Sequence, residues 1–181
     1  LAPAMNHGMW TNNLVQKNVA VLKDFGFQII GPTSGRQACG DMGMGRMAEP
    51  SEIEDYIQYF ITPKLLKGKN VVVTAGPTKE KFDPVRFLEN ESSGKMGYAI
   101  AKVAYNMGAN VTLISGKTTL IPPLPQQITL IEVISAIDML KSVEKVIQAS
   151  DIFISAAAVS DYRPKEYSQQ KIKKDTDNIS V

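Results

Sequence analysis

Strands and helices alternate along the chain from about residue 68 onward, and this alternation restricts the fold more than any other feature. Residues 70–75, NVVVTA, form a continuous run rich in β-branched side chains, which is typical of a strand buried on both faces. Further strands are predicted at 109–115, 128–133 and 151–157, and helices at 92–108 and 135–149. This order favours right-handed βαβ units and therefore an α/β fold with a parallel sheet.

The first third of the chain has another pattern. Residues 11–26 carry apolar side chains at helical spacing, with Thr11 or Asn12 as the N-cap and Gly26 as the stop. Residues 27–31, FQIIG, are predicted to form a short strand, which a glycine-rich loop follows.

A further helix is predicted over residues 50–60, where apolar side chains line one face. Ser51 and Glu54 have the spacing of a capping box at its start. Residues 62–69, TPKLLKGK, interrupt the periodicity with proline, glycine and lysines, as a linker does. We therefore predict a domain boundary near residue 67.

Composition excludes several classes of protein. Of the 181 residues 44% are hydrophobic, which is enough for a core, and a net charge of +2 gives no support to a nucleic-acid or membrane-surface role. A single cysteine and a single histidine exclude a disulfide framework and argue against a thiolate–imidazole metal site. With no membrane-spanning run or signal peptide, we expect a cytoplasmic protein. Because the chain begins at Leu1 and stops at Val181, we also expect a fragment of a longer protein.

Loops that follow parallel strands are where ligands bind, so the loops after Thr74, Ser115 and Ala156 are the places to search. The first of them reaches a helix start at 92–94, Ser-Ser-Gly, where hydroxyls, free backbone N–H groups and the helix dipole suit a phosphate. The loop fits neither the Walker A pattern nor G-x-G-x-x-G. A capped helix after a long loop is the alternative.

The stretch after the last strand, AAAVSDYRPKEYSQQKIKK, combines small residues with charged ones. Asp161 is suited to accept hydrogen bonds from a ribose or a base, and Lys171, Lys173 and Lys174 to neutralise phosphates. A solvated lysine cluster is the alternative.

Two stretches of the first third also carry polar groups suited to chemistry. In APAMN, the Asn6 amide beside Met5 is suited to hold a carboxylate or a flavin edge, although asparagine is also a common turn former. In QACGDMGMGRM, Cys39 is either a small buried residue or a thiol on a glycine-hinged lid. Arg46 would then offer an anion contact.

These motifs, taken together and in order, resemble the bifunctional phosphopantothenoylcysteine decarboxylase/phosphopantothenate–cysteine ligase family of bacterial coenzyme A synthesis. APAMN resembles the substrate-binding asparagine motif of flavin-dependent cysteine decarboxylases, and ACGDMGMGRM resembles their substrate-recognition clamp. TAGPT, RFLENESSGKMG, AAAVSDYRP and KIKK resemble ligase motifs. The resemblance runs nearly from end to end.

For residues 1–67 the resemblance implies the C-terminal part of a flavodoxin-like, FMN-dependent decarboxylase domain, which is a trimer in the family. The FMN-binding residues and a catalytic histidine would lie upstream. In the family, FMN oxidises the substrate thiol, carbon dioxide leaves, and the flavin reduces the resulting enethiolate. Cys39 matches the proton donor of that reduction and Asn6 the residue that holds the substrate carboxylate, while Met5 and Arg46 are implied to bind substrate.

For residues 68–181 the resemblance implies the N-terminal part of a Rossmann-like ligase domain, which forms a dimer. It uses CTP and Mg²⁺ to activate 4'-phosphopantothenate as an acyl-cytidylate, and cysteine then displaces CMP. Asn90 matches the residue that binds this intermediate, Asp161 a cytidine-binding aspartate and Lys171 the catalytic lysine. The nucleotide and phosphate cradle is implied to contain Gly76, Ser92, Ser93 and Gly94.

Two other functions compete with this two-activity enzyme. A catalytically inactive, decarboxylase-like regulatory or binding subunit would not need Asn6, Cys39, Asn90 and Lys171, all of which are present. A dinucleotide-dependent oxidoreductase would need the glycine fingerprint that this chain lacks.

Overall fold

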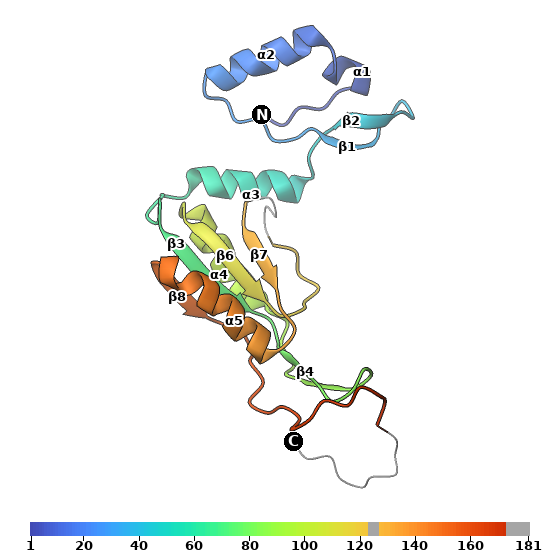
Figure 1. The fold of residues 1–181 in the computed structure, drawn as a ribbon. Coiled ribbons are helices and arrows are strands. Elements are labelled where there is room, and N and C mark those ends of the chain that lie inside the picture. Colours follow the sequence, from blue (N-terminus) through green and yellow to red (C-terminus); the bar gives the residue numbers. More distant parts are fainter. Residues whose placement is uncertain (123–126, 173–181) are drawn as a thin grey trace. The chain divides into compact units, whose positions relative to one another are not determined.

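A computed structural model describes residues 1–122 and 127–172, and the chain divides into two compact units (Figure 1). The first unit comprises Leu1–Ile61 and the second begins at Thr62.

The first unit contains three helices and a hairpin. The elements are α1 (His7–Trp10), α2 (Asn13–Asp24), β1 (Thr33–Arg36), β2 (Met42–Arg46) and α3 (Pro50–Ile61), and β1 pairs antiparallel with β2. The prediction for α2 is confirmed: the Asn12 side chain caps the helix by accepting from the Leu14 N–H at 2.8 Å. The chain then turns at Gly26, whose φ of 87° favours glycine.

Two local predictions for this unit were wrong. Residues 27–30 form no strand, because their backbone makes only two hydrogen bonds to Leu1, at 2.7 and 2.8 Å, which is too few for a ladder. Ser51 is not an N-cap, because α3 already begins at Pro50, whose fixed φ suits the first helical position. The cap position therefore falls on Glu49, whose carbonyl oxygen accepts from the Ile53 N–H at 3.0 Å.

The predicted glycine-rich loop is partly a strand. Gly43 and Gly45 lie within β2, and only residues 37–41 form the turn of the hairpin. Gly45 is buried, and its carbonyl oxygen accepts from the Met5 N–H at 2.8 Å. A Cβ at Gly45 would collide with the backbone of Met5, so the contact between the two segments requires glycine.

The second unit is built on a four-stranded parallel sheet, as predicted. Its strands are β3 (Asn70–Ala75), β6 (Asn110–Ser115), β7 (Thr129–Glu132) and β8 (Ile152–Ser155), in the order β7-β6-β3-β8. The remaining elements are the two-stranded β4 (Lys79–Lys81) and β5 (Phe87–Glu89), the helices α4 (Lys95–Asn106) and α5 (Ala136–Val146), and the 3₁₀ turn η1 (Ile147–Ala149).

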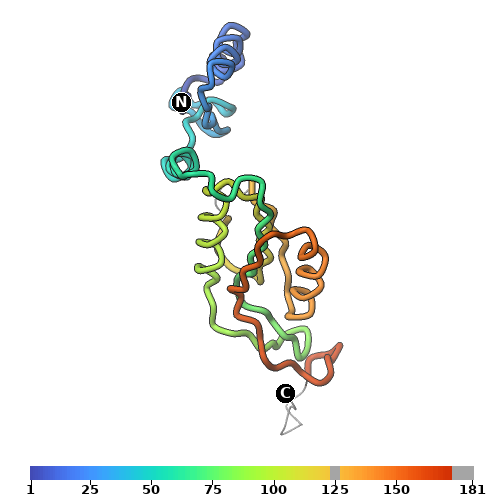
Figure 2. The backbone as a smooth tube through the Cα atoms, turned by 90° about the vertical axis from the view of Figure 1, so that its left-hand side faces the viewer, coloured from blue at the N-terminus to red at the C-terminus, as the bar shows by residue number. Residues whose placement is uncertain are grey.

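The two long helices of this unit cover opposite faces of the sheet (Figure 2). Alternate residues of β3 divide between them: Val71 and Val73 pack with the α4 side, and Val72 packs with the α5 side. Every residue of β3 after Asn70 is buried, which confirms a strand covered on both faces.

Each helix begins in a distinct way. Helix α5 begins with a capping box, in which Ser135 and Asp138 exchange side-chain and backbone hydrogen bonds. Helix α4 begins instead at Gly94, which has a left-handed φ of 74° and no side-chain cap. The buried face of α4 consists mostly of small residues: Gly97, Tyr98, Ala101 and Ala104. The helix therefore lies close against the sheet.

Candidate functional sites in the two units

Glycines bring the start of α4 against the end of β3. A Cβ at Gly97 would collide with that of Ala75 and stand 2.9 Å from the carbonyl oxygen of Thr74. A Cβ at Gly94 would stand 3.2 Å from the Cα of Gly76, and both residues have positive φ. The carboxyl end of the strand and the helix N-terminus thus meet backbone to backbone, as in sites that bind phosphate.

A cavity of about 740 Å³ opens beside this contact. Residue 77, residues 87–93 and residues 117–119 line it, so it lies between the loops that follow β3 and β6. The predicted residues Asn90, Ser92 and Ser93 are all on its wall.

The two serines contact the backbone of the helix start. Ser92 Oγ accepts from the Gly94 N–H at 3.3 Å, and Ser93 Oγ accepts from the Lys95 N–H at 3.5 Å. Both bonds are long, so an anionic oxygen is well suited to compete for the same N–H groups.

The amide of Asn90 links the cavity wall to the segment after β8. Its Nδ2 donates to the carbonyl oxygen of Val159 at 3.0 Å, which leaves one amide N–H and the amide oxygen for other partners. The Asn90 residue is exposed.

Two buried threonines hold the segment after β8 in place. Thr74 Oγ1 accepts from the Ala156 and Ala157 N–H groups at 3.2 and 3.3 Å. Thr78 Oγ1 accepts from the Ser160 N–H at 2.9 Å. Sequence reasoning missed both threonines, because a buried hydroxyl that bonds a segment some 80 residues away leaves no local pattern.

The remaining predicted residues of this unit lie elsewhere. Asp161 and Lys171 are exposed, and neither lines the cavity that contains Asn90. Lys173 and Lys174 are outside the described residues.

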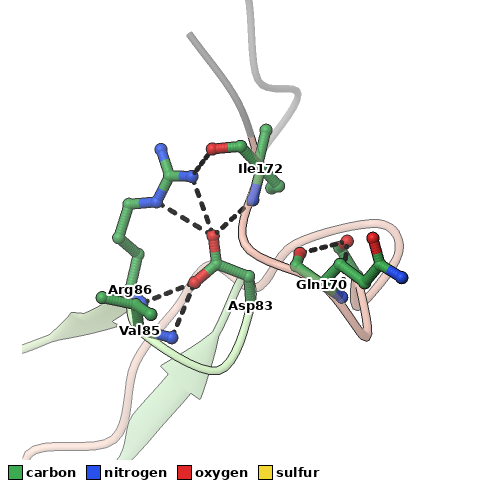
Figure 3. A network of polar contacts seen from close by, with 6 residues as sticks. Asp83, Val85, Arg86, Gln170 and Ile172 are labelled. Carbon is green, nitrogen blue, oxygen red and sulfur yellow. Dashed lines mark hydrogen bonds and ion pairs between the residues drawn. The ribbon is translucent and has the colours of Figure 1, made fainter.

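A polar network around Asp83 fastens the segment that carries Lys171 (Figure 3). Asp83 Oδ1 accepts from the Val85 and Arg86 N–H groups at 2.7 and 2.8 Å. Its Oδ2 accepts from Arg86 Nε at 2.9 Å, from Arg86 Nη2 at 2.8 Å and from the Ile172 N–H at 3.1 Å. Arg86 Nη2 also donates to the Ile172 carbonyl oxygen. No local sequence pattern marks Asp83 or Arg86, because their partner Ile172 lies more than 80 residues away.

The hydrogen bonds determine the ionisation of Asp83. Burial alone raises the pKa of this carboxyl group. The hydrogen bonds from Val85, Ile172 and Arg86 outweigh burial and lower the pKa from 3.8 to about 2. Asp83 therefore carries its negative charge at neutral pH.

The first unit has a cavity of about 430 Å³ at the turn of its hairpin. The predicted residues Met5, Asn6, Cys39 and Arg46 all line it. Cys39 is exposed, so the alternative of a small buried cysteine was wrong. Arg46 forms an ion pair with Glu49, so its guanidinium already has an anionic partner.

The thiol of Cys39 lies within a small polar cluster. Asn6 Nδ2 donates to Cys39 Sγ at 3.2 Å and to Asp41 Oδ2 at 3.4 Å, and the thiol donates to the same carboxylate oxygen at 3.4 Å. Gln37 Oε1 accepts from the His7 N–H at 2.9 Å. Sequence reasoning missed Gln37 and Asp41, although both flank Cys39 in the motif.

Within residues 1–122 and 127–172, no group of three or more His, Cys, Asp or Glu side chains is placed to hold a metal ion. No helix in the same part of the chain is long and apolar enough to cross a membrane.

Comparison with known proteins gives two family matches that follow the two units. Residues 66–181 match the DNA/pantothenate metabolism flavoprotein C-terminal domain, and residues 1–62 match the family described as Flavoprotein. A crystal structure of the C-terminal domain of coenzyme A biosynthesis bifunctional protein CoaBC is 52% identical, with a TM-score of 0.54 over 60% of this chain and 57% of that one. The DNA/pantothenate metabolism flavoprotein from Streptococcus pneumoniae is 32% identical, with a TM-score of 0.51 over 54% of this chain and 42% of that one.

Similar sequences support the same family assignment. The coenzyme A biosynthesis bifunctional protein CoaBC of Vibrio cholerae is 49% identical over all of this chain, and that of Haemophilus influenzae is 50% identical over all of it. The protein of the same name from Escherichia coli strain K12 is 47% identical over 95%. The chain spans 45%, 45% and 42% of these three relatives. With its larger unit matched by the family model and its whole length by these sequences, the chain belongs to the family of the DNA/pantothenate metabolism flavoprotein C-terminal domain.

Proposed function

We propose that this chain belongs to a bifunctional enzyme of coenzyme A biosynthesis from pantothenate. Residues 68–181 form part of a ligase that joins cysteine to 4'-phosphopantothenate with CTP through an acyl-cytidylate. Residues 1–67 form part of an FMN-dependent decarboxylase that converts phosphopantothenoylcysteine to 4'-phosphopantetheine. The relatives named for this pathway support the proposal, and the observation that carries it is that Asn90, Ser92 and Ser93 share one cavity at the start of α4.

In the ligase reaction the carboxylate oxygen of 4'-phosphopantothenate attacks the α-phosphorus of CTP, and pyrophosphate leaves. The free N–H of the Asn90 amide donates to the acyl-cytidylate, whose charge it helps to stabilise. The backbone N–H groups at the start of α4 bind phosphate oxygens, with Ser92, Ser93, Gly94 and Gly76 in the cradle. Asp161 accepts from the cytidine, and Lys171 stabilises phosphate charge as a catalytic residue.

Cysteine completes the ligase reaction. Its amine attacks the acyl carbon of the cytidylate, an amide bond forms and CMP leaves. The described residues do not fit a metal site built by the protein, so Mg²⁺ is proposed to arrive on the phosphates of CTP, as this ion commonly does.

In the decarboxylase reaction Asn6 and Met5 bind the substrate, and the Asn6 amide holds its carboxylate. The flavoprotein match supports a flavin cofactor, and FMN, when bound, supplies the two-electron oxidation and reduction. The groups at the cavity fit such chemistry, because a thiol and an amide lie together on its exposed wall. Cys39 donates its Sγ proton to the enethiolate carbon and regains a proton from water, to which it is exposed.

The assembly and location of the enzyme follow from the same proposal. We propose a trimer through the decarboxylase part and a dimer through the ligase part, in the cytoplasm. Its partners are small molecules, and a net charge of only +2 does not favour electrostatic binding of a nucleic acid.

Pyrophosphate release by the full-length protein tests the ligase assignment. The wild type is expected to release pyrophosphate only when CTP and 4'-phosphopantothenate are both present, and the amide product is expected only with cysteine. Asn90→Ala should slow the reaction about 100-fold, because it removes a donor to developing charge. Asn110→Ala is the matched control, because its amide bonds Asn70 at the amino end of the sheet.

Two results would contradict the proposal. Equal rates for wild type and Asn90→Ala would remove the role given to Asn90. If the wild type catalysed neither the ligase nor the decarboxylase reaction but still bound a protein partner, the inactive regulatory subunit would be supported instead.

A further inference from the structure

Asp83 holds a segment that is 89 residues away in the sequence. The carboxyl group is fully buried, and one of its oxygens accepts from the Ile172 N–H. Arg86, which is paired with the same oxygen, donates to the Ile172 carbonyl oxygen. Both backbone polar groups of Ile172 are therefore bound by one ion pair (Figure 3).

A second contact supports this attachment. The Ser168 N–H donates to the Phe82 carbonyl oxygen at 2.9 Å, so the segment is held on both sides of Lys171. Lys171 itself is exposed. Its backbone is thus fixed while its long side chain stays accessible to a ligand.

The two oxygens of Asp83 have separate tasks. Oδ1 accepts from the Val85 and Arg86 N–H groups, which closes the local turn between β4 and β5. Oδ2 accepts from the Arg86 guanidinium and from Ile172. A turn alone needs only the first oxygen, and the second is used for the distant segment.

We propose that Asp83 is a positioning residue for Lys171: through Arg86 and the backbone of Ile172 it fixes the point from which the lysine reaches the phosphates. This inference rests on the function proposed above for Lys171. It deepens that proposal by naming the group that holds the catalytic lysine in position relative to the ligase site.

Asp83→Asn separates the two tasks of the carboxylate. Its amide oxygen is still able to accept from the local turn, whereas its NH₂ group faces the Arg86 donors and the Ile172 N–H without a lone pair to offer. The turn is retained, whereas the hydrogen bond from the Ile172 N–H and the ion pair that holds Arg86 are lost.

Asp151→Asn is the matched control. Asp151 also accepts from a backbone N–H, that of Asn70, and from a cation, Lys69, at 2.8 and 2.9 Å. These contacts lie at the amino end of β3, whereas ligands of such sheets bind at the carboxyl ends.

The kinetic test is a double-mutant cycle in the full-length protein. Asp83→Asn should lower kcat for pyrophosphate release by about 10- to 100-fold, because a misplaced catalytic group costs up to that much. The KM for CTP should change less than about threefold, because Lys171 acts on charge that develops in the transition state. In the Lys171→Ala background, Asp83→Asn should cause no further loss. If the fold-losses in kcat of Asp83→Asn and Lys171→Ala multiply in the double variant, the two residues act independently and the proposal is overturned.

Hydrogen exchange provides a readout that does not depend on activity. The Ile172 amide should exchange about tenfold faster in Asp83→Asn than in the wild type, and at the wild-type rate in Asp151→Asn. An unchanged Ile172 rate in Asp83→Asn would overturn the attachment itself. Full activity of Lys171→Ala, with faster Ile172 exchange in Asp83→Asn, would instead contradict the function proposed for Lys171 and leave the attachment standing.

Discussion

The side-chain amide of Asn90 donates to the carbonyl oxygen of Val159 at 3.0 Å, across 69 positions of sequence. This bond ties the loop before α4 to the segment after β8. Two separate stretches that sequence analysis associated with nucleotide chemistry are therefore joined by one hydrogen bond.

Asn90→Asp should impair the ligase reaction at least as strongly as Asn90→Ala. A carboxylate has no proton to donate to Val159, and its negative charge repels the phosphates of the substrate. We expect a loss of about 100-fold or more in kcat for pyrophosphate release by the full-length protein. A rate for Asn90→Asp close to that of the wild type would contradict both the bond and the proposed role.

Gly97→Ala should destabilise the second unit. Alanine favours a helix over glycine by about 1 kcal/mol, but the new Cβ collides with Ala75, and overpacking of this kind costs about 1–3 kcal/mol. We therefore expect a net loss of up to about 2 kcal/mol in the free energy of unfolding, measured by urea denaturation. Met96→Ala, on the exposed side of the same helix, is the control and should change stability by less than about 0.5 kcal/mol.

The low pKa of Asp83 predicts a specific loss of stability in acid. Because the folded-state pKa is about 2 and the ordinary value is 3.8, the carboxylate stabilises the fold fully above 3.8. Its contribution is lost as the pH falls from 3.8 toward 2. The wild type should therefore lose stability more steeply than Asp83→Asn across this interval.

Chemical denaturation of both proteins at several acidic pH values measures this difference. The carboxyl groups of Asp138 and Asp151 also have lowered pKa values, so both proteins should weaken in acid. Only the difference between the two curves belongs to Asp83. Parallel curves would show that its ionisation is not linked to folding.

Cys39→Ser should interrupt the decarboxylase reaction after carbon dioxide has left. A serine hydroxyl is a much weaker acid than a thiol, so it is a poor proton donor to the enethiolate. The oxidised, decarboxylated intermediate should accumulate in the full-length variant, as detected by mass spectrometry. Lys23→Ala, at an exposed position of α2 that does not line the cavity, is the control. An unchanged yield of 4'-phosphopantetheine from Cys39→Ser would remove the thiol from the mechanism.

The sequence was sufficient for most of the second unit. Buried β-branched runs such as 70–75 and helices with strong caps, such as that of Ser135 and Asp138, are encoded by neighbouring residues. The predictions were wrong where local structure depends on hydrogen-bond partners or on the exact position of the helix start. Residues 27–30 have strand-like composition but share only two backbone hydrogen bonds with Leu1. Helix α3 begins at Pro50, one residue before the predicted N-cap Ser51.

The candidate sites divide in the same way. Ser92 and Ser93 were selected because they precede a helix, and Asn90 because its motif resembles one of the ligase family. All three line one cavity, and their roles stay predictions. Asp83 and Thr78 were missed because their partners lie 89 and 82 residues away, at distances where no local spacing links them. Asp161 and Lys171 stay predictions, carried by motif resemblance.

The contact between Gly76 and Gly94 has a consequence for ligand selection. Both glycines are buried, and a Cβ at either position would stand 2.9 Å from the Thr118 methyl group, so neither position accepts a side chain without moving its neighbours. Substitution at this contact therefore offers no route to a different ligand. Any change in the ligand accepted has to come from the residues that line the cavity, 77, 87–93 and 117–119.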